Sequence, residues 1–457
     1  MNIMGFSAYH HDSAAVNIHN NLIEGGSHEE RFTRKKYDNS FPINTFRWLR
    51  NQKEQPDVVA FYEKRDFMDR QNIKRDIKKA LPGKFDIEFF EHHDCHAMSS
   101  ICTTEWDRCA VMVVDSMGGK YATSLGIFED DKISWLKRFE YPNSLGLFYS
   151  TITRFLGFRP LSDEEKVMSA AAYGEPKWVK YAKEKIINTE LGEYTLLQDL
   201  RRGIGEGTLD WDVAKSAQDI LQECLINLAS WLHTETGSSK LAYAGGVALN
   251  CVANTELVRY TGFKEIAIQP AAGDAGCALG AAALVQRPLW EGPYIGFNDS
   301  LDQHPEEIAH RIMQGEVVPV LNGRAEFGPR ALGNRSILCL PTELNISKLN
   351  NIKKRINDTW RPYAPICLDS VAEDYFDIYI PSYDMLFVAF SETDLFRTHD
   401  DTARLQLVNS SKNGFLGKIL EITTAHNHPI LINTSLNVKG KPIVNSVDDF
   451  KNEMKVF

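Results

Sequence analysis

Four short apolar runs in this chain each lead into a turn of small residues that carries an acid or a pair of glycines. The turns span 8–14, 115–119, 245–250 and 269–276. Glycine lets the backbone approach a ligand closely, and a helix that follows such a turn presents free N–H groups to phosphate. The pattern predicts an α/β fold whose functional groups gather at the ends of buried strands.

Extended runs alternate with helical periodicity along most of the chain. We expect strands at 2–7, 14–18, 57–61, 109–114 and 241–244, the second of which runs into a turn at 19–21 that suggests a hairpin. We expect helices at 144–156, 211–236 and 274–285. Gly, Pro, Asn and Asp interrupt the pattern between 286 and 305. We therefore predict two domains, residues 1–300 and 309–457.

Composition narrows the class of protein. The eight cysteines contain no CxxC pair, which suits free thiols in a reducing compartment. No membrane-length apolar run or secretory leader is evident, so we expect a cytoplasmic protein that does not bind membranes. The net charge of -10 gives no overall support for nucleic-acid binding. Basic stretches at 31–36 and 74–79 are typical of solvated faces.

Two histidines and an acid form a candidate metal site. His92 and His96 are four residues apart, so on a helix they lie on one face. Asp115 ends the apolar run 111–114, and two imidazoles with a carboxylate can hold a divalent metal. The alternative is one surface histidine and one hydrogen-bonded core histidine. Asp274 at the start of an Ala-rich helix could likewise be a helix cap.

These segments resemble the O-carbamoyltransferase family, which includes the tobramycin, cephem and nodulation-factor carbamoyltransferases. In the first domain the similar motifs are His11-Asp12-Ser13-Ala14-Ala15, Glu29-Glu30-Arg31-Phe32, His92-His93 with His96-Ala97, Glu165-Lys166-Val167-Met168, Gly245-Gly246-Val247-Ala248-Leu249-Asn250 and Asp274-Ala275-Gly276. In the second they are Phe327-Gly328-Pro329-Arg330, Lys353-Lys354-Arg355, Trp360-Arg361-Pro362, Thr402-Ala403-Arg404 and Asn433-Thr434-Ser435-Leu436-Asn437.

The resemblance implies an N-terminal domain of the actin, Hsp70 and sugar-kinase type, built of two ribonuclease-H-like lobes. It implies a C-terminal α/β domain like threonylcarbamoyl-adenylate synthase (YrdC-like). In that domain ATP and carbamoyl phosphate would give carbamoyl-adenylate, and the first domain would transfer the carbamoyl group to an acceptor hydroxyl.

The resemblance also implies the site residues. It assigns His92, His96, Asp115 and Asp274 as ligands of Fe²⁺ or another divalent metal, with Mg²⁺ as a further candidate ion. The catalytic candidates are His11 as general base, Asp12 and Lys166. Residues expected to bind the nucleotide or carbamoyl phosphate are Gly118, Gly119, Gly245, Gly246, Asn250, Arg324, Arg330, Lys354, Arg355, Arg361, Arg404, Ser435 and Asn437.

The sequence does not determine which molecule accepts the carbamoyl group. A small hydroxylated metabolite, such as an antibiotic or a sugar, is the family's usual acceptor. A hydroxymethylated pyrimidine in phage DNA is the alternative; it would need the basic stretches in the cleft and Phe139, Tyr141 and Phe148 as stacking platforms. Two further readings are a tRNA threonylcarbamoyl transferase and a non-catalytic nucleotide-binding scaffold.

Three departures from the family pattern bear on the site. The family's Asp-Gly-Thr-Ala-Arg element reads Asp400-Asp401-Thr402-Ala403-Arg404 here, so Asp401 stands where relatives have glycine. The chain also stops soon after 442–444, where relatives carry a longer tail, and the stretch 42–91 is short. We expect a more open acceptor pocket and a homodimer.

Overall fold

The computed structural model describes residues 1–50, 55–64, 66–202, 207–354, 358–391, 400–455 and 457. They form two compact units, the first of Met1–Thr33 and Tyr37–Gly292 and the second of Arg34–Lys36 and Pro293–Phe457. The division after Gly292 lies a few residues before the domain limits of 300 and 309 expected from the sequence. No helix in the described ranges is both long and apolar enough to cross a membrane.

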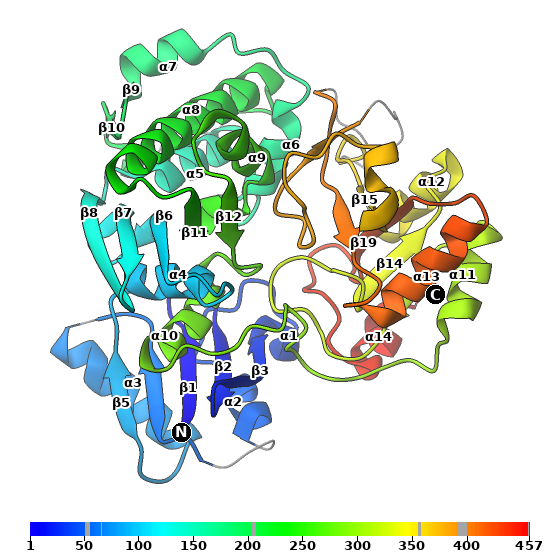
Figure 1. Cartoon of the computed structure of the whole chain (residues 1–457), viewed down its shortest axis with the longest axis horizontal. Coiled ribbons are helices and arrows are strands. Elements are labelled where there is room, and N and C mark those ends of the chain that lie inside the picture. Colours follow the sequence, from blue (N-terminus) through cyan, green and yellow to red (C-terminus); the bar gives the residue numbers. More distant parts are fainter. Residues whose placement is uncertain (51–54, 65, 203–206, 355–357, 392–399, 456) are drawn as a thin grey trace. The chain divides into compact units, whose positions relative to one another are not determined.

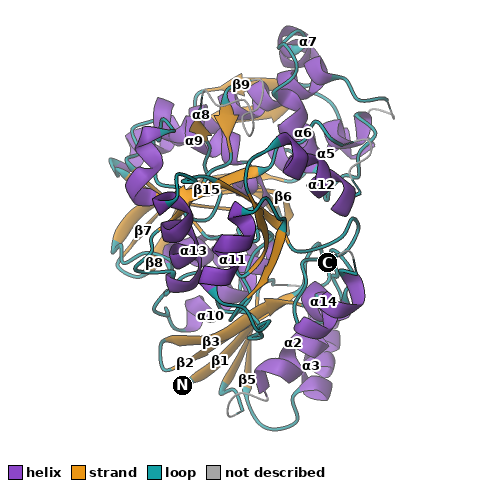
Figure 2. Ribbon diagram, turned by 90° about the vertical axis from the view of Figure 1, so that its right-hand side faces the viewer, coloured by secondary structure: helices purple, strands orange, loops and turns teal. Residues whose placement is uncertain are grey.

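The first unit opens with a mixed five-stranded sheet of order β3-β2-β1-β4-β5. Its strands are β1 (Asn2–Ser7), β2 (Ala14–His19), β3 (Leu22–His28), β4 (Val58–Phe61) and β5 (Asp86–Phe89). β1–β2 and β2–β3 pair antiparallel, whereas β1–β4 and β4–β5 pair parallel. Figure 2 shows these strands with α2 (Ile43–Arg50) and α3 (Phe67–Ala80) beside them.

A second sheet of order β12-β11-β6-β7-β8 repeats this arrangement. Its strands are β6 (Arg108–Gly118), β7 (Tyr121–Glu129), β8 (Lys132–Glu140), β11 (Lys240–Ala244) and β12 (Glu265–Ile268). β6–β7 and β7–β8 are antiparallel, and β6–β11 and β11–β12 are parallel. The two mixed sheets confirm the α/β class, and their shared strand order and directions match the duplicated lobes that the resemblance implies.

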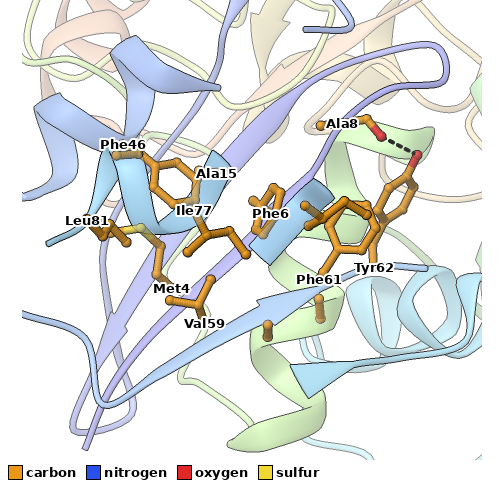
Figure 3. Close-up of a cluster of buried hydrophobic side chains, with 14 of the residues drawn as sticks. Met4, Phe6, Ala8, Ala15, Phe46, Val59, Phe61, Tyr62, Ile77 and Leu81 are labelled. Atoms are coloured by element: carbon orange, nitrogen blue, oxygen red, sulfur yellow. Dashed lines mark hydrogen bonds between the residues drawn. The ribbon is translucent and has the colours of Figure 1, made fainter. Parts of the chain in front are cut away.

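Alternation along β1 explains how the first sheet is covered. Successive side chains of a strand point to opposite faces. Met4 and Phe6 point into a buried cluster that includes Phe46 of α2 and Ile77 of α3 (Figure 3). Gly5 between them faces the other way, where an added Cβ would lie 2.1 Å from the carbonyl oxygen of Ala278. One face of β1 thus carries large side chains, and Gly5 on the other face lets a helix approach closely.

The helix that approaches Gly5 is α10 (Cys277–Val285), and it packs against a second helix, α4 (His92–Ile101). α4 follows the last strand of the first sheet and packs against β6 and β11 of the second; α10 follows the last strand of the second sheet and packs against β1, β2 and β4 (Figure 1). The two helices also contact each other, and a Cβ on Gly280 would lie 1.8 Å from the Cys95 carbonyl oxygen. Residues from both lobes therefore meet along this contact.

The remaining elements of the first unit connect these sheets. They are α1 (Glu30–Thr33), α5 (Leu145–Phe155), α6 (Glu164–Ala171), α7 (Val179–Lys185), β9 (Ile187–Glu190), β10 (Glu193–Leu196), η1 (Leu200–Arg202), α8 (Trp211–Thr236), η2 (Gly246–Leu249), α9 (Cys251–Tyr260) and η3 (Asp274–Gly276). The strands and helices expected from the sequence are confirmed, with ends that shift by a few residues. Residues 274–276 form a 3-10 turn before α10.

The second unit has its own sheet, of order β13-β14-β19-β15-β18. Its elements are α11 (Pro305–Met313), β13 (Val318–Leu321), β14 (Arg335–Cys339), α12 (Glu343–Ile352), β15 (Ala364–Leu368), η4 (Asp369–Asp374), β16 (Ala389–Phe390), β17 (Thr402–Ala403), β18 (Gln406–Val408), α13 (Gly414–Ala425), β19 (Leu431–Ser435) and α14 (Val447–Glu453). α11 and α13 contribute to one apolar core, and α12 and α14 to another. The YrdC-like identity of this unit stays a prediction.

Candidate functional site

Four buried side chains from three segments converge in the first unit. α4 begins at His92, so its first turn places His92 and His96 on one face. Asp115 lies in β6, and Asp274 opens η3 just before α10. Their exposed fractions are 2% and 0% for the histidines and 5% and 7% for the acids. The helical spacing expected for the histidines is confirmed.

The distances suit one cation between these groups. His92 Nε2 lies 3.4 Å from an Asp115 oxygen and 3.6 Å from an Asp274 oxygen. The corresponding distances from His96 Nε2 are 3.7 and 3.5 Å. One ligand atom from each residue lies within 4.8 Å of the others. Two imidazole nitrogens and two carboxylate oxygens are a donor set that Fe²⁺, Zn²⁺ and Mn²⁺ accept.

The polar atoms of this group also fit a cation better than a hydrogen-bonded core. All four ring nitrogens of His92 and His96 are buried without a hydrogen bond within the described residues. Burial acts to raise the pKa of Asp115, but contacts with His92 and His96 outweigh it and hold that pKa well below its usual range. The Asp115 carboxylate therefore stays charged, and a buried charge of this kind requires positive charge beside it.

Three of the glycines expected to bind nucleotide serve this centre. A Cβ on Gly118 would lie 2.6 Å from the His92 ring and 2.7 Å from His93 Nε2, so only glycine lets β6 pass there. Gly245 has φ +95°, and a Cβ would lie 2.2 Å from the Val114 carbonyl oxygen. The backbone N–H of Gly246 donates to Asp115 Oδ1 at 3.3 Å. These contacts position Asp115 and the histidines, which is a role that the sequence did not reveal.

A polar chain fixes the start of α4. His93 Nδ1 and Ser124 Oγ lie 2.7 Å apart, and Arg138 Nε donates to the same oxygen at 3.0 Å. Arg138 also donates to both oxygens of Glu91, at 2.9 and 2.7 Å. Glu91 precedes the helix, and His93 lies between the candidate ligands His92 and His96. This series of hydrogen bonds therefore orients the start of α4, which carries both ligands.

The catalytic candidates lie in the same unit. His11 Nδ1 is 3.0 Å from Asp12 Oδ2, and its Nε2 contacts the carbonyl oxygen of Leu161. Burial acts to lower the pKa of His11, but Asp12 and other acceptors raise it to about 10. The imidazole is then protonated at neutral pH, so the general-base role needs prior loss of a proton and stays a prediction. Lys166 pairs with Asp163 at 3.0 Å.

Asn250 and Gly119 have local structural roles, and their part in nucleotide binding stays a prediction. Asn250 caps α9 through Ala253 N–H and exchanges two hydrogen bonds with Gln218, at 3.1 and 2.9 Å. Both polar atoms of its side chain are thus engaged inside the protein. Gly119 adopts φ +65° at the β6–β7 turn, a conformation that glycine accepts without strain.

The second unit contains a candidate anion-binding group around Lys353, a residue that the sequence did not assign to the site. Lys353 is 7% exposed, and its Nζ donates to Asn437 Oδ1 at 2.7 Å and Ser435 Oγ at 3.1 Å. The same Nζ also contacts the backbone carbonyl oxygens of Ser435 and Asn437. Ser435 Oγ donates in turn to Asn437 Oδ1 at 2.7 Å. The predicted Lys354 instead lines an open hollow on α12 with Asn350 and Thr359.

The arginines expected to bind the nucleotide or carbamoyl phosphate lie in different surroundings. Arg324 donates to the backbone carbonyls of Ile295 and Gly296, at 2.6 and 3.3 Å, which indicates a structural role for its guanidinium. Arg330, Arg361 and Arg404 are half-buried and engage other groups of the chain. Arg355 lies outside the described residues.

Two family models match the chain. One, described as the carbamoyltransferase N-terminus, matches residues 61–283, and the other, the carbamoyltransferase C-terminus, matches residues 309–456. The first match contains all four residues of the buried centre, and the second contains Lys353, Ser435 and Asn437.

Relatives with known sequences extend these matches over nearly the whole chain. An uncharacterized protein of Synechocystis is 32% identical over 98% of this chain and 93% of its own length. The nodulation protein NolNO of Sinorhizobium fredii is 30% identical over 97% of this chain and 76% of its own. The 3'-hydroxymethylcephem-O-carbamoyltransferase of Amycolatopsis lactamdurans is 28% identical over 68% of this chain and 65% of its own.

Similarity to solved structures is weaker. The structure of HypF from T. kodakarensis matches with a TM-score of 0.40 at 16% identity, over 62% of this chain and 47% of that one. The ROK hexokinase of Thermus thermophilus matches with a TM-score of 0.37 at 14% identity, over 63% of this chain and 100% of that one. Scores this low support no conclusion about function.

Proposed function

Because this chain belongs to the carbamoyltransferase family, we propose that it is an ATP-dependent O-carbamoyltransferase acting on a small hydroxylated metabolite. The observation that carries the proposal is the buried group of His92, His96, Asp115 and Asp274, whose donors fit one divalent cation. The similarity to an enzyme named as a cephem O-carbamoyltransferase supports a hydroxyl as the acceptor.

The reaction divides between the two units. In the second, which we take to be YrdC-like, carbamoyl phosphate, water and ATP give carbamoyl-adenylate, phosphate and pyrophosphate. Lys353, held by Ser435 and Asn437, supplies positive charge to the phosphate oxygens. In the first unit the acceptor hydroxyl attacks the carbamoyl carbon, and AMP leaves with the electron pair of the broken C–O bond.

The side chains of the first unit prepare that transfer. His92, His96, Asp115 and Asp274 would hold a cation, which would polarise the carbamoyl carbonyl as a Lewis acid or lower the pKa of the acceptor hydroxyl. His11 is held between Asp12 and the Leu161 carbonyl, so its ring is fixed in orientation. Once deprotonated, it would accept the hydroxyl proton as that oxygen attacks.

DNA with a hydroxymethylated base is the second candidate acceptor. It is favoured by a basic face on α3, where Lys74, Arg75, Lys78 and Lys79 line one exposed hollow. The stacking platforms expected for a flipped base do not support it, because Phe139 is 9% exposed and Phe148 is 1% exposed. We therefore rank the small-molecule acceptor first.

The test combines the protein with ATP, carbamoyl phosphate and Fe²⁺, and offers two separate acceptor pools. One pool holds hydroxylated metabolites and the other DNA containing 5-hydroxymethylcytosine. We expect pyrophosphate release and a carbamoylated product in the metabolite pool, read by mass spectrometry. Product only in digested DNA would replace the proposed acceptor by the second one. No pyrophosphate and no product under any condition would contradict the proposal and leave a nucleotide-binding scaffold.

A further inference from the structure

A cysteine lies against the candidate metal centre. Cys277 is the first residue of α10, directly after the turn that carries Asp274, and its side chain is fully buried. One donor atom each from His92, His96 and Cys277 lies within 4.8 Å of the other two. Among the cysteines of the described chain, Cys277 alone belongs to such a group of possible ligands.

The two histidines provide a second observation that points to a ligand at this position. They are 2% and 0% exposed, and none of their ring nitrogens makes a hydrogen bond within the part of the chain that the structure describes. A buried imidazole nitrogen without a partner is costly unless it binds a proton donor or a cation. A cation bound by one nitrogen of each histidine would therefore also lie within reach of the sulfur.

We propose that Cys277 is a sulfur donor of the candidate metal centre, so that His92 and His96 can hold a cation either with the thiolate of Cys277 or with the carboxylates of Asp115 and Asp274. On binding, the S–H bond breaks, a sulfur–metal bond forms, and the proton passes to the buffer. A thiolate selects Zn²⁺, Co²⁺ and Fe²⁺ over Mg²⁺ and Mn²⁺.

Cobalt(II) absorption tests this inference without any assay of activity. We expect the Co²⁺-loaded wild type to show an intense near-ultraviolet band from thiolate-to-metal charge transfer. Cys277→Ser and Cys277→Ala should lose the band while the weaker visible bands of bound cobalt remain. The matched control is Cys251→Ser, since Cys251 is also the buried first residue of a helix in this unit and lies near Met168 instead. That variant should keep the band.

Metal preference gives the second measurement. By competition titration, Cys277→Ser should weaken Zn²⁺ binding by at least about tenfold. Mutation of a residue that only hydrogen-bonds a metal ligand already costs about tenfold in metal affinity, and loss of a ligand should cost no less. Binding of Mn²⁺ should change far less, because oxygen and nitrogen donors suffice for it. Circular dichroism of each variant checks that it is folded.

The outcomes separate this inference from the proposed function, on whose metal centre it rests. A charge-transfer band that is missing in cobalt-bound wild type, or unchanged in Cys277→Ser, would overturn the sulfur ligand. Failure of every divalent metal to bind would overturn the centre itself. Cobalt binding with the expected band, but no carbamoyl transfer to any acceptor, would contradict the proposed function and leave the sulfur ligand supported.

Discussion

At the scale of single residues, two glycines near the candidate metal centre are under different steric constraints. A Cβ on Gly118 would lie 2.6–2.8 Å from the rings of His92 and His93. A Cβ on Gly273 would meet nothing within 4 Å, and the backbone there has φ -74°, which any residue adopts. The two positions thus form a matched pair beside the same site.

The first prediction uses that pair. Gly118→Ala should weaken divalent-metal binding by about tenfold or more, because His92 must move off its position to admit the methyl group. Gly273→Ala should bind metal like the wild type. Isothermal titration with Zn²⁺ measures both. Equal affinities in the two variants would show that β6 can shift without moving the ligands.

A buried histidine sets a pH dependence of stability. Burial lowers the pKa of His28 from 6.5 to about 4. As the pH falls, the unfolded chain therefore protonates this histidine at a higher pH than the folded chain does. Because the unfolded state binds more protons between these values, stability contributed at neutral pH is lost as pH falls from 6.5 toward 4. A shift of this size corresponds to about 3 kcal/mol.

The second prediction follows. Urea midpoints of the wild type should fall across that pH window, and those of His28→Gln should fall less. His426→Gln changes an exposed histidine at the end of α13 and should retain the wild-type slope. The same slope in all three proteins would show that His28 does not titrate in this range.

At the scale of elements, the α4–α10 contact determines whether the ligands from both lobes meet. α4 carries His92 and His96, and α10 begins with Cys277 directly after Asp274. Gly280 lets the helices approach so closely that an added Cβ would lie 1.8 Å from the Cys95 carbonyl oxygen. Any bulk at this point must separate the two helices.

The third prediction concerns this contact. Gly280→Ala should destabilise the first unit by about 1–3 kcal/mol, as overpacking does, and should also weaken metal binding because the ligands move apart. Gly414→Ala is the control, since Gly414 starts α13 of the other unit and an added Cβ meets nothing within 4 Å. Denaturation curves and metal titrations of both variants measure the effect. Stability lost without any change in affinity would mean that the helices separate away from the site.

The elements themselves were largely predictable from the sequence, whereas their contacts were not. Apolar runs and turn chemistry located strand β1, strand β6 and the helix 211–236, although β6 continues past Asp115 to Gly118. The spacing of His92 and His96 predicted a shared helical face. The position of Cys277 beside them depends on how the two lobes cross, which no local pattern encodes. Likewise, Lys353 and Lys354 are equivalent in sequence, and only the fold distinguishes them.

At the scale of the whole molecule, the two units should perform separable steps. Lys353 contacts Ser435 and Asn437 in the second unit, and Asp274 belongs to the buried centre of the first. If the proposed division of the reaction is right, substitutions in one unit should stop its own step and leave the other step measurable.

The fourth prediction tests this division with two measurements, pyrophosphate release and carbamoyl transfer. Lys353→Met should reduce pyrophosphate release by about 100-fold or more, the cost of losing a buried charge-stabilising donor, and should bind metal normally. Lys354→Met is its neighbouring control and should remain active, because Lys354 lines an open hollow instead. Asp274→Asn should release pyrophosphate from ATP and carbamoyl phosphate yet carbamoylate no acceptor. If Asp274→Asn instead lost pyrophosphate release while Lys353→Met kept it, the assignment of steps to units would be reversed.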